Sequence, residues 1–303
     1  ILSVVSFLVL IPFVPTIATP VNIANLFSNI WPLLAIAIGQ TFVLIIAGID
    51  LSQGSIMAVV SVVGGMIMTN EVDPILFQKS PIWGVFIGDK GGLLAGSPFA
   101  VPVALIVMLL VGIIIGFLNG FAIAQFKIPA FMVTLVSQIF FSSFAIFLVK
   151  SENIIHLPKT FTAIGSEGIG FIPYSMFITG AIAIFAQWVL DRTVFGKWLY
   201  AVGTNVRAAV LSGVPSQKVI IMAYTFSGFC AAIGSILYSA RLQGGRPTLG
   251  QNLLLDIVGA AVIGGSSLAG GKGKVLWTLF GVIFLQLLGN ALSLLNVPYF
   301  TIY

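Results

Sequence analysis

The sequence predicts an all-α polytopic membrane protein, and three observations support this fold class. Of the 303 residues, 59% are hydrophobic and only 7% are charged, which leaves too few charges to coat a globule of this size. Apolar runs of about 20 residues can cross a bilayer as helices, because helices satisfy their backbone groups internally. The third observation is that 103–118 and 277–288 are nearly continuous apolar runs, whereas the strands of a membrane barrel would alternate.

Nine apolar segments are candidate membrane spans, and we expect about ten transmembrane helices in all. The first segment is short and begins within an apolar run, so we expect a truncated first helix rather than a cleaved signal peptide. We expect the last helix to lie beyond residue 303. The candidate spans are 1–14, 30–47, 54–69, 99–118, 129–149, 172–190, 218–239, 254–268 and 275–294.

The positive charges of the loops predict the orientation of the chain, because Lys and Arg are denser in cytoplasmic loops. One set of loops, which includes 191–217, holds seven of the 13 Lys and Arg in short segments. The other set, 70–98, 150–171 and 240–253, holds the remaining six in about twice the length, together with most of the acids. We therefore place 191–217 in the cytoplasm. The cations are too scattered to form a stripe that binds nucleic acid.

A glycine-flanked break at 48–55, with the sequence Gly-Ile-Asp-Leu-Ser-Gln-Gly-Ser, carries one of only eight Asp and Glu in the chain. A charge near hydrocarbon costs roughly 2.5–3.5 kcal/mol, so Asp50 needs a water-lined path or a specific partner. We favour a carboxylate that accepts backbone N–H bonds at the start of the next helix, with Ser52 as a cap, near the cytoplasmic edge. The residues expected to shape a gate are Gly48, Asp50, Ser52, Gly54 and Asp256.

A second glycine-flanked break, at 244–250, resembles the first. Each break precedes a helix rich in small residues, and the count of spans places the first break at the cytoplasmic side and the second outside. An inverted repeat would produce this pattern, and chance similarity is the alternative. Separately, glycines spaced by four predict a groove that admits another helix of the same subunit; they are Gly112, Gly116 and Gly120.

The residues that are absent argue against an enzyme. His156 is the only histidine and Cys230 the only cysteine, so neither a His-Glu-x-x-His zinc site, a serine triad nor an internal disulfide can be built. The glycine-rich segment 264–273 departs from a phosphate-binding loop at its first glycine and at its hydroxyl residue. We expect no metal or cofactor on this chain, and ATP-driven transport would need another subunit for hydrolysis.

The loop 191–217 is the longest predicted cytoplasmic loop. Its sequence predicts a short amphipathic helix that could bind a partner. Asn205 or Thr204 can cap the helix and Gly213 can end it. Apolar residues spaced by three and four can share one of its faces, namely Val206, Ala209 and Val210.

Three motifs in this order, at 48–55, 201–213 and 255–273, resemble the permease subunit of ABC-type monosaccharide importers, the ribose permease type. The resemblance implies one transmembrane permease domain over 1–303 in the bacterial inner membrane, with about ten helices in an inverted repeat. It implies a second permease subunit, identical or different, two cytoplasmic ATP-binding subunits that carry ATP and Mg, an extracytoplasmic sugar-binding protein, and lipid around the spans. Related branched-chain amino acid permeases match 48–55 less well, and Arg246 is a departure that leaves the substrate subtype open.

The resemblance also implies that 191–217 is the segment that couples the permease to the ATPase. The coupling residues are Gly203, Asn205, Arg207, Ala208, Ala209, Leu211, Ser212 and Gly213.

Neutral polar residues inside the spans are the candidates for the translocation path. Sugars are uncharged and rich in hydroxyls, so a path for them should offer amides and hydroxyls. Gln40, Asn119 and Gln138 rank highest, and hydrogen bonding between helices is the alternative role for each. Two other classes remain open. An ion-coupled carrier should show paired acids near the middle of the membrane, and a receptor-like or structural membrane protein would need no path.

Overall fold

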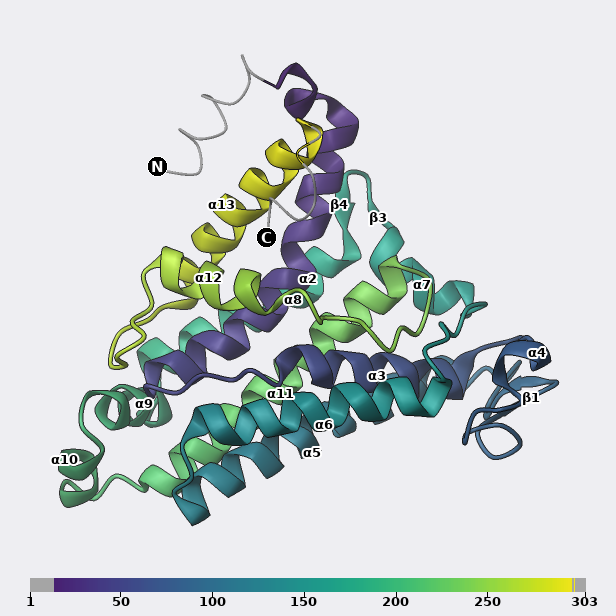
Figure 1. Ribbon diagram of the computed structural model, residues 1–303. Helices are drawn as coiled ribbons and strands as arrows, with labels where there is room; N and C mark the ends of the chain where they lie inside the picture. Colours follow the sequence, from purple (N-terminus) through teal and green to yellow (C-terminus); the bar gives the residue numbers. More distant parts are fainter. Residues whose placement is uncertain (1–13, 296, 298–303) are drawn as a thin grey trace.

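The structure is a computed structural model that describes residues 14–295 and 297. This part of the chain is helical apart from loops and two short hairpins (Figure 1). The helices are η1 (Pro15–Ala18), α2 (Pro20–Ile45), α3 (Gln53–Met68), α4 (Pro74–Phe77), α5 (Ala100–Phe126), α6 (Ala130–Val149), α7 (Lys159–Ser166), α8 (Tyr174–Arg192), α9 (Val194–Thr204), α10 (Val206–Leu211), α11 (Ser216–Arg241), α12 (Leu254–Gly264) and α13 (Val275–Leu294). The hairpins are β1 (Ile87–Gly88) with β2 (Gly91–Gly92) and β3 (Gly168–Ile169) with β4 (Ile172–Pro173).

Six of the described helices are long and apolar enough to cross a membrane, namely α2, α5, α6, α8, α11 and α13. They confirm the all-α membrane class. Two predicted spans, 54–69 and 254–268, are not among the six. Helix α3 has 16 residues and α12 has 11, so their rises of about 24 Å and about 17 Å fall short of a bilayer core of about 30 Å. The first predicted span, 1–14, lies outside the described residues except for its last residue, and so does the expected helix beyond residue 303.

Helix α11 packs against α5, α2 and α3. The glycine groove predicted on α5 is where α11 lies: a methyl group on Gly112 would come within 2.5 Å of the Gly228 carbonyl oxygen, and one on Gly120 within 2.9 Å of Ile221. The prediction of a packing groove inside one subunit is confirmed, because the two backbones approach too closely for any larger residue.

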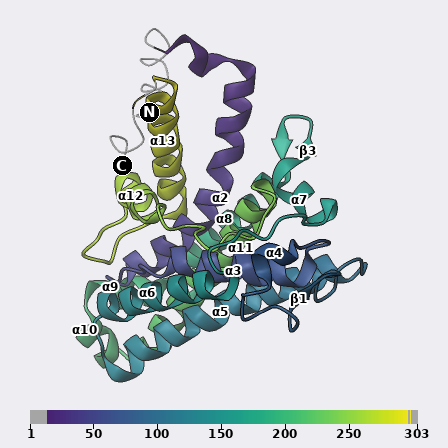
Figure 2. The same cartoon turned by 45° about the vertical axis from the view of Figure 1, so that its right-hand side comes forward.

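Helix α3 runs parallel to α11, and three polar contacts join the two helices at intervals of four residues on α3. Gln53 Nε2 donates to Ser227 Oγ (2.8 Å), Ser235 Oγ donates to the Met57 carbonyl (2.8 Å), and the hydroxyls of Ser61 and Ser239 lie 2.6 Å apart. On the other side of the bundle α13 lies beside α2, as Figure 2 shows; Thr41 bonds Thr278 near one end and Asn22 bonds Asn290 near the other.

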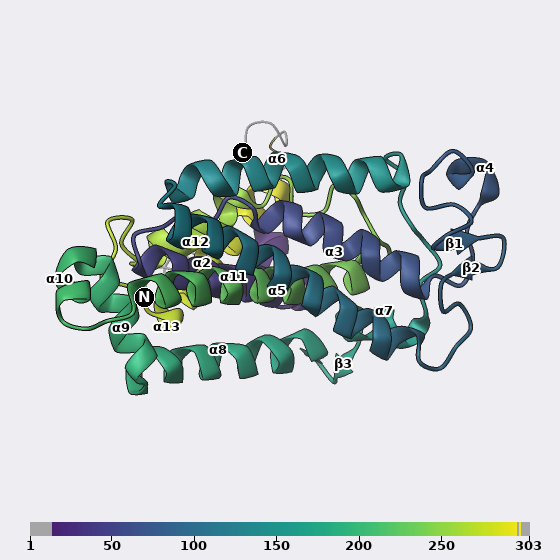
Figure 3. The ribbon, with the colours of Figure 1, turned by 90° about the horizontal axis from the view of Figure 1, so that it is seen from below.

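The loops gather at two ends of the bundle, as the charge pattern predicts. Figure 3 shows the axes of α5, α6, α8 and α11 roughly aligned, with α9 and α10 at one end and α4 and the β1–β2 hairpin at the other. At the second end Asn70 N donates to the His156 carbonyl, and Ile154 pairs with Gly245. The loops 70–98 and 150–171 and the start of 240–253 therefore share the end that we assign to the outside.

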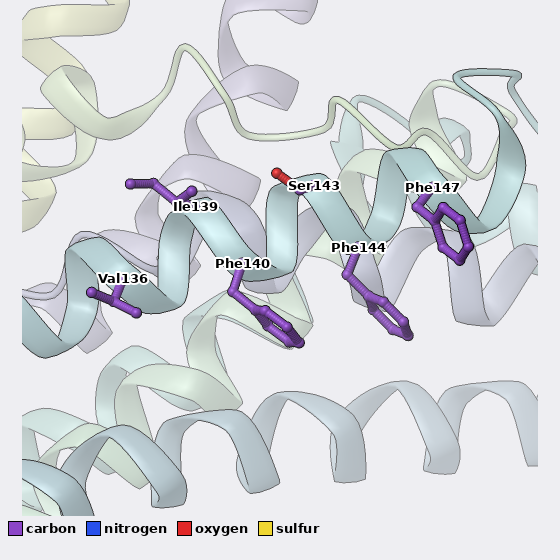
Figure 4. Close-up of a pocket in the computed structure, with 6 residues that line it drawn as sticks. All are labelled: Val136, Ile139, Phe140, Ser143, Phe144 and Phe147. Atoms are coloured by element: carbon purple, nitrogen blue, oxygen red, sulfur yellow. The ribbon is translucent and has the colours of Figure 1, made fainter.

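The outward face of α6 is apolar and aromatic. In Figure 4 Phe140 and Phe144 project to the same side, and their rings stack with an interplanar angle of 5°. The residues that border a hollow on this face are Val136, Ile139, Phe140, Ser143, Phe144 and Phe147. Such a surface suits a hydrocarbon environment and not water.

Candidate functional site

The first break re-enters the bundle. After α2 ends at Ile45, Ala47 takes a left-handed backbone conformation (φ 58°), and the chain turns back before α3 begins at Gln53. Gly48 fits here because a methyl group would lie 2.5 Å from the Tyr224 hydroxyl. Since Gln53 bonds Ser227, which lies near the middle of α11, the end of the break is deep in the bundle. The break begins at the end that we assign to the cytoplasm, where Gly271 N donates to the Ile45 carbonyl, and its later part from Asp50 to Gln53 therefore lies deeper than we expected.

Asp50 is fully buried and accepts three hydrogen bonds. Its Oδ1 atom accepts from the Ser52 backbone N–H (3.0 Å) and from Ser52 Oγ (2.6 Å), and its Oδ2 atom accepts from Ser227 Oγ (2.7 Å). The predicted acceptance of a backbone N–H just before a helix is confirmed. Ser52 stands at the N-cap of α3 but its side chain bonds no helix N–H; its hydroxyl donates to Asp50 and accepts from Asn119.

Two amides complete the set of buried side chains that we name the polar cluster: Asp50, Ser52, Gln53, Asn119 and Ser227. Asn119 Nδ2 donates to Ser52 Oγ (2.8 Å), and Gln53 Nε2 donates to Ser227 Oγ (2.8 Å) and to the Ile36 carbonyl (3.2 Å). Each hydroxyl thus donates to Asp50 and accepts from an amide. The polar cluster joins α2, α3, α5 and α11, so it fixes the break against three spanning helices.

The second break, at 244–250, contacts α3, the helix that follows the first break. Arg246 N donates to Ser61 Oγ (2.9 Å), and a methyl group on Gly54 would come within 2.5 Å of the Gly250 carbonyl oxygen. The loop after α11 therefore runs back along α3 toward the start of that helix. Gly250 has a φ of +87°, so glycine is required there both by the backbone and by the contact.

Helices α3 and α12 begin near this glycine contact and lead to opposite ends of the bundle. The start of α12 follows directly, since Leu253 N donates to the Gly250 carbonyl (3.1 Å). Helix α3 ends at the outer end, where Thr69 Oγ1 donates to the Ile155 carbonyl (2.7 Å). Helix α12 ends beside Trp277, at the start of α13. Asp256 lies half-buried in the first turn of α12, where an acid is favoured by the helix dipole.

The three residues predicted for the path are not brought together. Asn119 belongs to the polar cluster, whereas Gln138 lies half-exposed on α6. Gln40 is fully buried on α2, and neither atom of its amide has a hydrogen-bond partner in the described part of the chain. Its neighbour Gly39 borders the polar cluster, since a methyl group on Gly39 would lie 3.1 Å from Gln53 Nε2.

Sequence reasoning missed Gln53, Ser227 and Tyr224. Tyr224 and Ser227 are three residues apart and therefore share a face of α11, which is the only local signal that the sequence carries for them. The described residues hold no group of three His, Cys, Asp or Glu that could bind a metal ion. The polar cluster makes its hydrogen bonds within the protein, except at Gln53 Oε1, which is buried without a partner in the described part of the chain.

The end that we assign to the cytoplasm carries two short helices, α9 and α10, where the sequence predicts one. Asn205 caps α10 as predicted, with its Oδ1 atom accepting from Ala208 N (3.0 Å). Gly213 follows the helix with a φ of +80°. The predicted apolar face is only partly buried: Ala209 packs inward, whereas Val206, Val210 and Leu211 are exposed, the last by 89%.

The residues predicted to couple to an ATPase divide between surface and interior. Six are exposed: Asn205, Arg207, Ala208, Leu211, Ser212 and Gly213. Ala209 and Gly203 are buried, and a methyl group on Gly203 would overlap the Ile45 carbonyl oxygen at the end of α2. Gly203 therefore presents no surface to a partner, and instead lets α9 approach α2.

The glycine-rich segment 264–273 fastens α9 to the end of α2. Tyr200 donates its hydroxyl hydrogen to the Gly273 carbonyl (2.7 Å), and Gly271 N donates to the Ile45 carbonyl (2.8 Å). Burial, together with the nearby charge of Asp191, raises the pKa of Tyr200, so the phenol keeps its proton and its hydrogen bond. The cytoplasmic helices are thus attached to the residues that precede the first break.

A helical membrane bundle in which two short helices begin near one point in the interior is typical of transport proteins. The comparisons with known proteins agree. Residues 22–302 match the family described as the permease component of branched-chain amino acid transport systems. The chain therefore belongs to this family of permease components and is a multi-pass protein of the inner membrane.

Relatives with sugar-transport names match nearly the whole chain. It is 31% identical to the ribose import permease protein of Escherichia coli K12, over 97% of this chain and 86% of that protein. It is 33% identical to the ribose import permease protein of Bacillus subtilis, over 94% and 81%. It is 29% identical to the xylose transport system permease protein of Haemophilus influenzae, over 92% and 84%. No solved structure matches the chain.

Proposed function

We propose that this chain is the permease subunit of an ATP-driven ABC importer of a monosaccharide or a similar polyhydroxylated solute. The observation that carries the proposal is the likeness to ribose and xylose permeases over more than nine-tenths of the chain. The site suits this solute, because the hydroxyls and amides of the polar cluster can exchange hydrogen bonds with sugar hydroxyls. ATP and Mg belong to two cytoplasmic partner subunits, and a second permease subunit and an extracytoplasmic sugar-binding protein complete the importer.

The closed polar cluster acts as a gate in this proposal. Opening the path requires α3 and α12 to separate at the contact between Gly54 and Gly250, while Asn119 and Gln40 turn toward the passing solute. Gln40 already lacks a partner inside the protein, so a solute or water in the open state would satisfy its amide. Asp50 holds the break in shape and does not bind the sugar.

The full permease would have about ten transmembrane helices in an inverted repeat. The meeting of α3 and α12 supports the repeat, since two half-crossings that begin near one point and lead to opposite ends are related by an axis in the membrane plane. The glycine contact at the start of both helices lies close to such an axis.

Motion at the ATPase would reach the gate through α9. The exposed side of α10 that carries Asn205, Ala208 and Ser212 is the surface for the ATPase, and Gly203 and the segment 264–273 transmit its movement to Ile45. The break at Asp50 begins directly after this contact, so a shift of the end of α2 strains the polar cluster.

The test is Ala208→Glu in the importer reconstituted with its ATPase and binding protein. Ala208 is exposed and its backbone N–H is already held by Asn205, so a glutamate at this third helical position keeps α10 folded. We expect the stimulation of ATPase activity by loaded binding protein to fall at least tenfold, because a new charge at a buried contact costs more than about 1.4 kcal/mol.

Thr160→Glu is the matched control, because it places the same acid at an exposed position of α7, at the outer end. Gly203 is unsuitable for this test, since any side chain there would disturb the fold. Normal stimulation in the Ala208→Glu complex would refute the coupling role of α10.

A branched-chain amino acid is the second candidate solute, and the description of the matching family favours it. Measurement of which solute the partner binding protein retains separates the two. An ion-coupled carrier is disfavoured, because the polar cluster contains a single acid, Asp50, and not a pair.

A further inference from the structure

A basic groove lies at the cytoplasmic end of the bundle, outside the polar cluster. It has a volume of about 930 Å³ and is formed by the end of α5, by α10 and by the start of α11. Each of these elements contributes one cation, namely Lys127, Arg207 and Lys218. None of the described residues that line the groove is acidic, so the lining does not neutralise the positive charge of these three side chains.

The two spans that border the groove indicate its position relative to the membrane. Helix α5 ends at Phe126 and α11 begins at Ser216, and both helices are candidate membrane spans. The groove therefore lies where the apolar spans end, at the level of lipid headgroups. Phe121 and Phe126, which are exposed on the last turns of α5, extend an apolar surface from this level toward the membrane core.

The walls of the groove are apolar between the cations. Ile123 and Ile128 line the side of α5, and Val210 and Ile220 line the opposite side. A ligand that fills the groove must combine a negative charge for the three cations with hydrocarbon for these walls. An anionic phospholipid has both features and already surrounds the protein at this depth.

We propose that the groove binds an anionic phospholipid of the cytoplasmic leaflet. The phosphate group lies among Lys127, Arg207 and Lys218, and the acyl chains run along the outer face of α5. The bound lipid braces α10 against α5 and α11. An acidic segment of the ATPase is the competing occupant, and it is disfavoured because apolar side chains of two spanning helices, Ile123 of α5 and Ile220 of α11, line the groove beside the cations.

Native mass spectrometry of the detergent-purified chain tests the proposal with two lipids of identical acyl chains, phosphatidylglycerol and phosphatidylcholine. We expect phosphatidylglycerol to be retained preferentially. The variant Lys127→Gln/Lys218→Gln should bind it about 25-fold more weakly, since each cation near the surface contributes about fivefold to the affinity for an anionic lipid. Both lysines are exposed, so the variant should fold, and gel filtration checks that it does.

Lys197→Gln/Lys272→Gln is the matched control, because it removes two exposed lysines at the same end but outside the groove. Its affinity for phosphatidylglycerol should equal that of the wild type. An equal loss in both double variants, or no preference between the lipids, would overturn the proposal. Displacement of phosphatidylglycerol by millimolar inorganic phosphate would show a site for free anions. Unchanged lipid binding with lost ATPase co-purification would identify the groove as a contact for the ATPase.

Discussion

Asp50 is the residue around which the polar cluster is built. Its carboxylate is fully buried, and burial of a charge is unfavourable unless hydrogen bonds replace its water. Ser52 and Ser227 supply those bonds, and each serine is in turn held by an amide. Loss of one member therefore leaves the others unsatisfied, which makes the polar cluster cooperative.

Asp50→Asn should destabilise the folded permease by about 1.5–3 kcal/mol, the contribution of hydrogen bonds to a charged group. In the variant, one carboxylate oxygen of residue 50 is replaced by an NH2 group, which donates hydrogen bonds and does not accept them. The serine hydroxyl that faces it then loses its acceptor, while it still accepts from Asn119 or Gln53. Thermal unfolding in detergent measures the loss. Asp89→Asn, on the exposed β1–β2 hairpin, is the control and should change little.

A role for Asp50 in binding gives a different result. Folding of Asp50→Asn would then be unaffected, and the preference among sugars would change. A double-mutant cycle with Ser227→Ala distinguishes the two roles, because a structural pair should show a coupling energy of about 0.5–3 kcal/mol.

Gln40→Leu should stabilise the closed state and slow transport. The amide of Gln40 has no partner inside the described protein, and a buried polar group without a partner costs about 1–3 kcal/mol. Leucine has a similar volume and removes this cost, but it offers nothing to a passing sugar. A higher unfolding temperature with reduced uptake supports a place on the path. Unchanged uptake would assign Gln40 a packing role only.

At the scale of elements, the features that depend on neighbouring residues were predicted correctly, and the contacts between distant residues were not. The cap by Asn205, the end at Gly213 and the groove of α5 follow from residues within one or two turns, so spacing reveals them. The bond between Asp50 and Ser227 joins residues 177 positions apart. The sequence around a serine in an apolar helix does not indicate which distant segment its side chain contacts.

The depth of the first break shows a second limit of the sequence. The pattern of 48–55 marks where α2 stops, but it does not reveal that the chain turns back before α3 starts. The start of α3 is fixed by the contact of Gly54 with Gly250 and by the bonds of Gln53. Both are tertiary contacts, and they place Asp50 in the middle of the bundle and not at its edge.

Gly116→Ala should disrupt the packing of α5 on α11. A methyl group there would overlap the Tyr224 carbonyl oxygen and come within 3.0 Å of Gly228, and overpacking of this kind costs about 1–3 kcal/mol. Gly180→Ala on α8 is the matched control, because nothing lies within 4 Å of its added methyl group. The control should keep or raise the unfolding temperature, since alanine favours the helix by up to about 1 kcal/mol. Equal unfolding temperatures would contradict the close contact.

At the scale of the whole molecule, one series of contacts connects the exposed helix α10 with the polar cluster in the middle of the bundle. The exposed side of α10 leads to α9, and α9 leads through Gly203 to the end of α2. The break at Asp50 follows, with the polar cluster and the meeting point of α3 and α12. A permease that is moved by an ATPase needs a mechanical connection of this kind, whereas a carrier driven by an ion gradient does not.

The uptake of a labelled monosaccharide by proteoliposomes tests the central claim most directly. The vesicles contain this permease with its ATPase subunits, and the loaded binding protein is supplied outside. We predict accumulation that requires internal ATP and the binding protein and that persists when ionophores collapse the proton and sodium gradients. Accumulation that continues without ATP and disappears with the ionophores would contradict the account and identify an ion-coupled carrier.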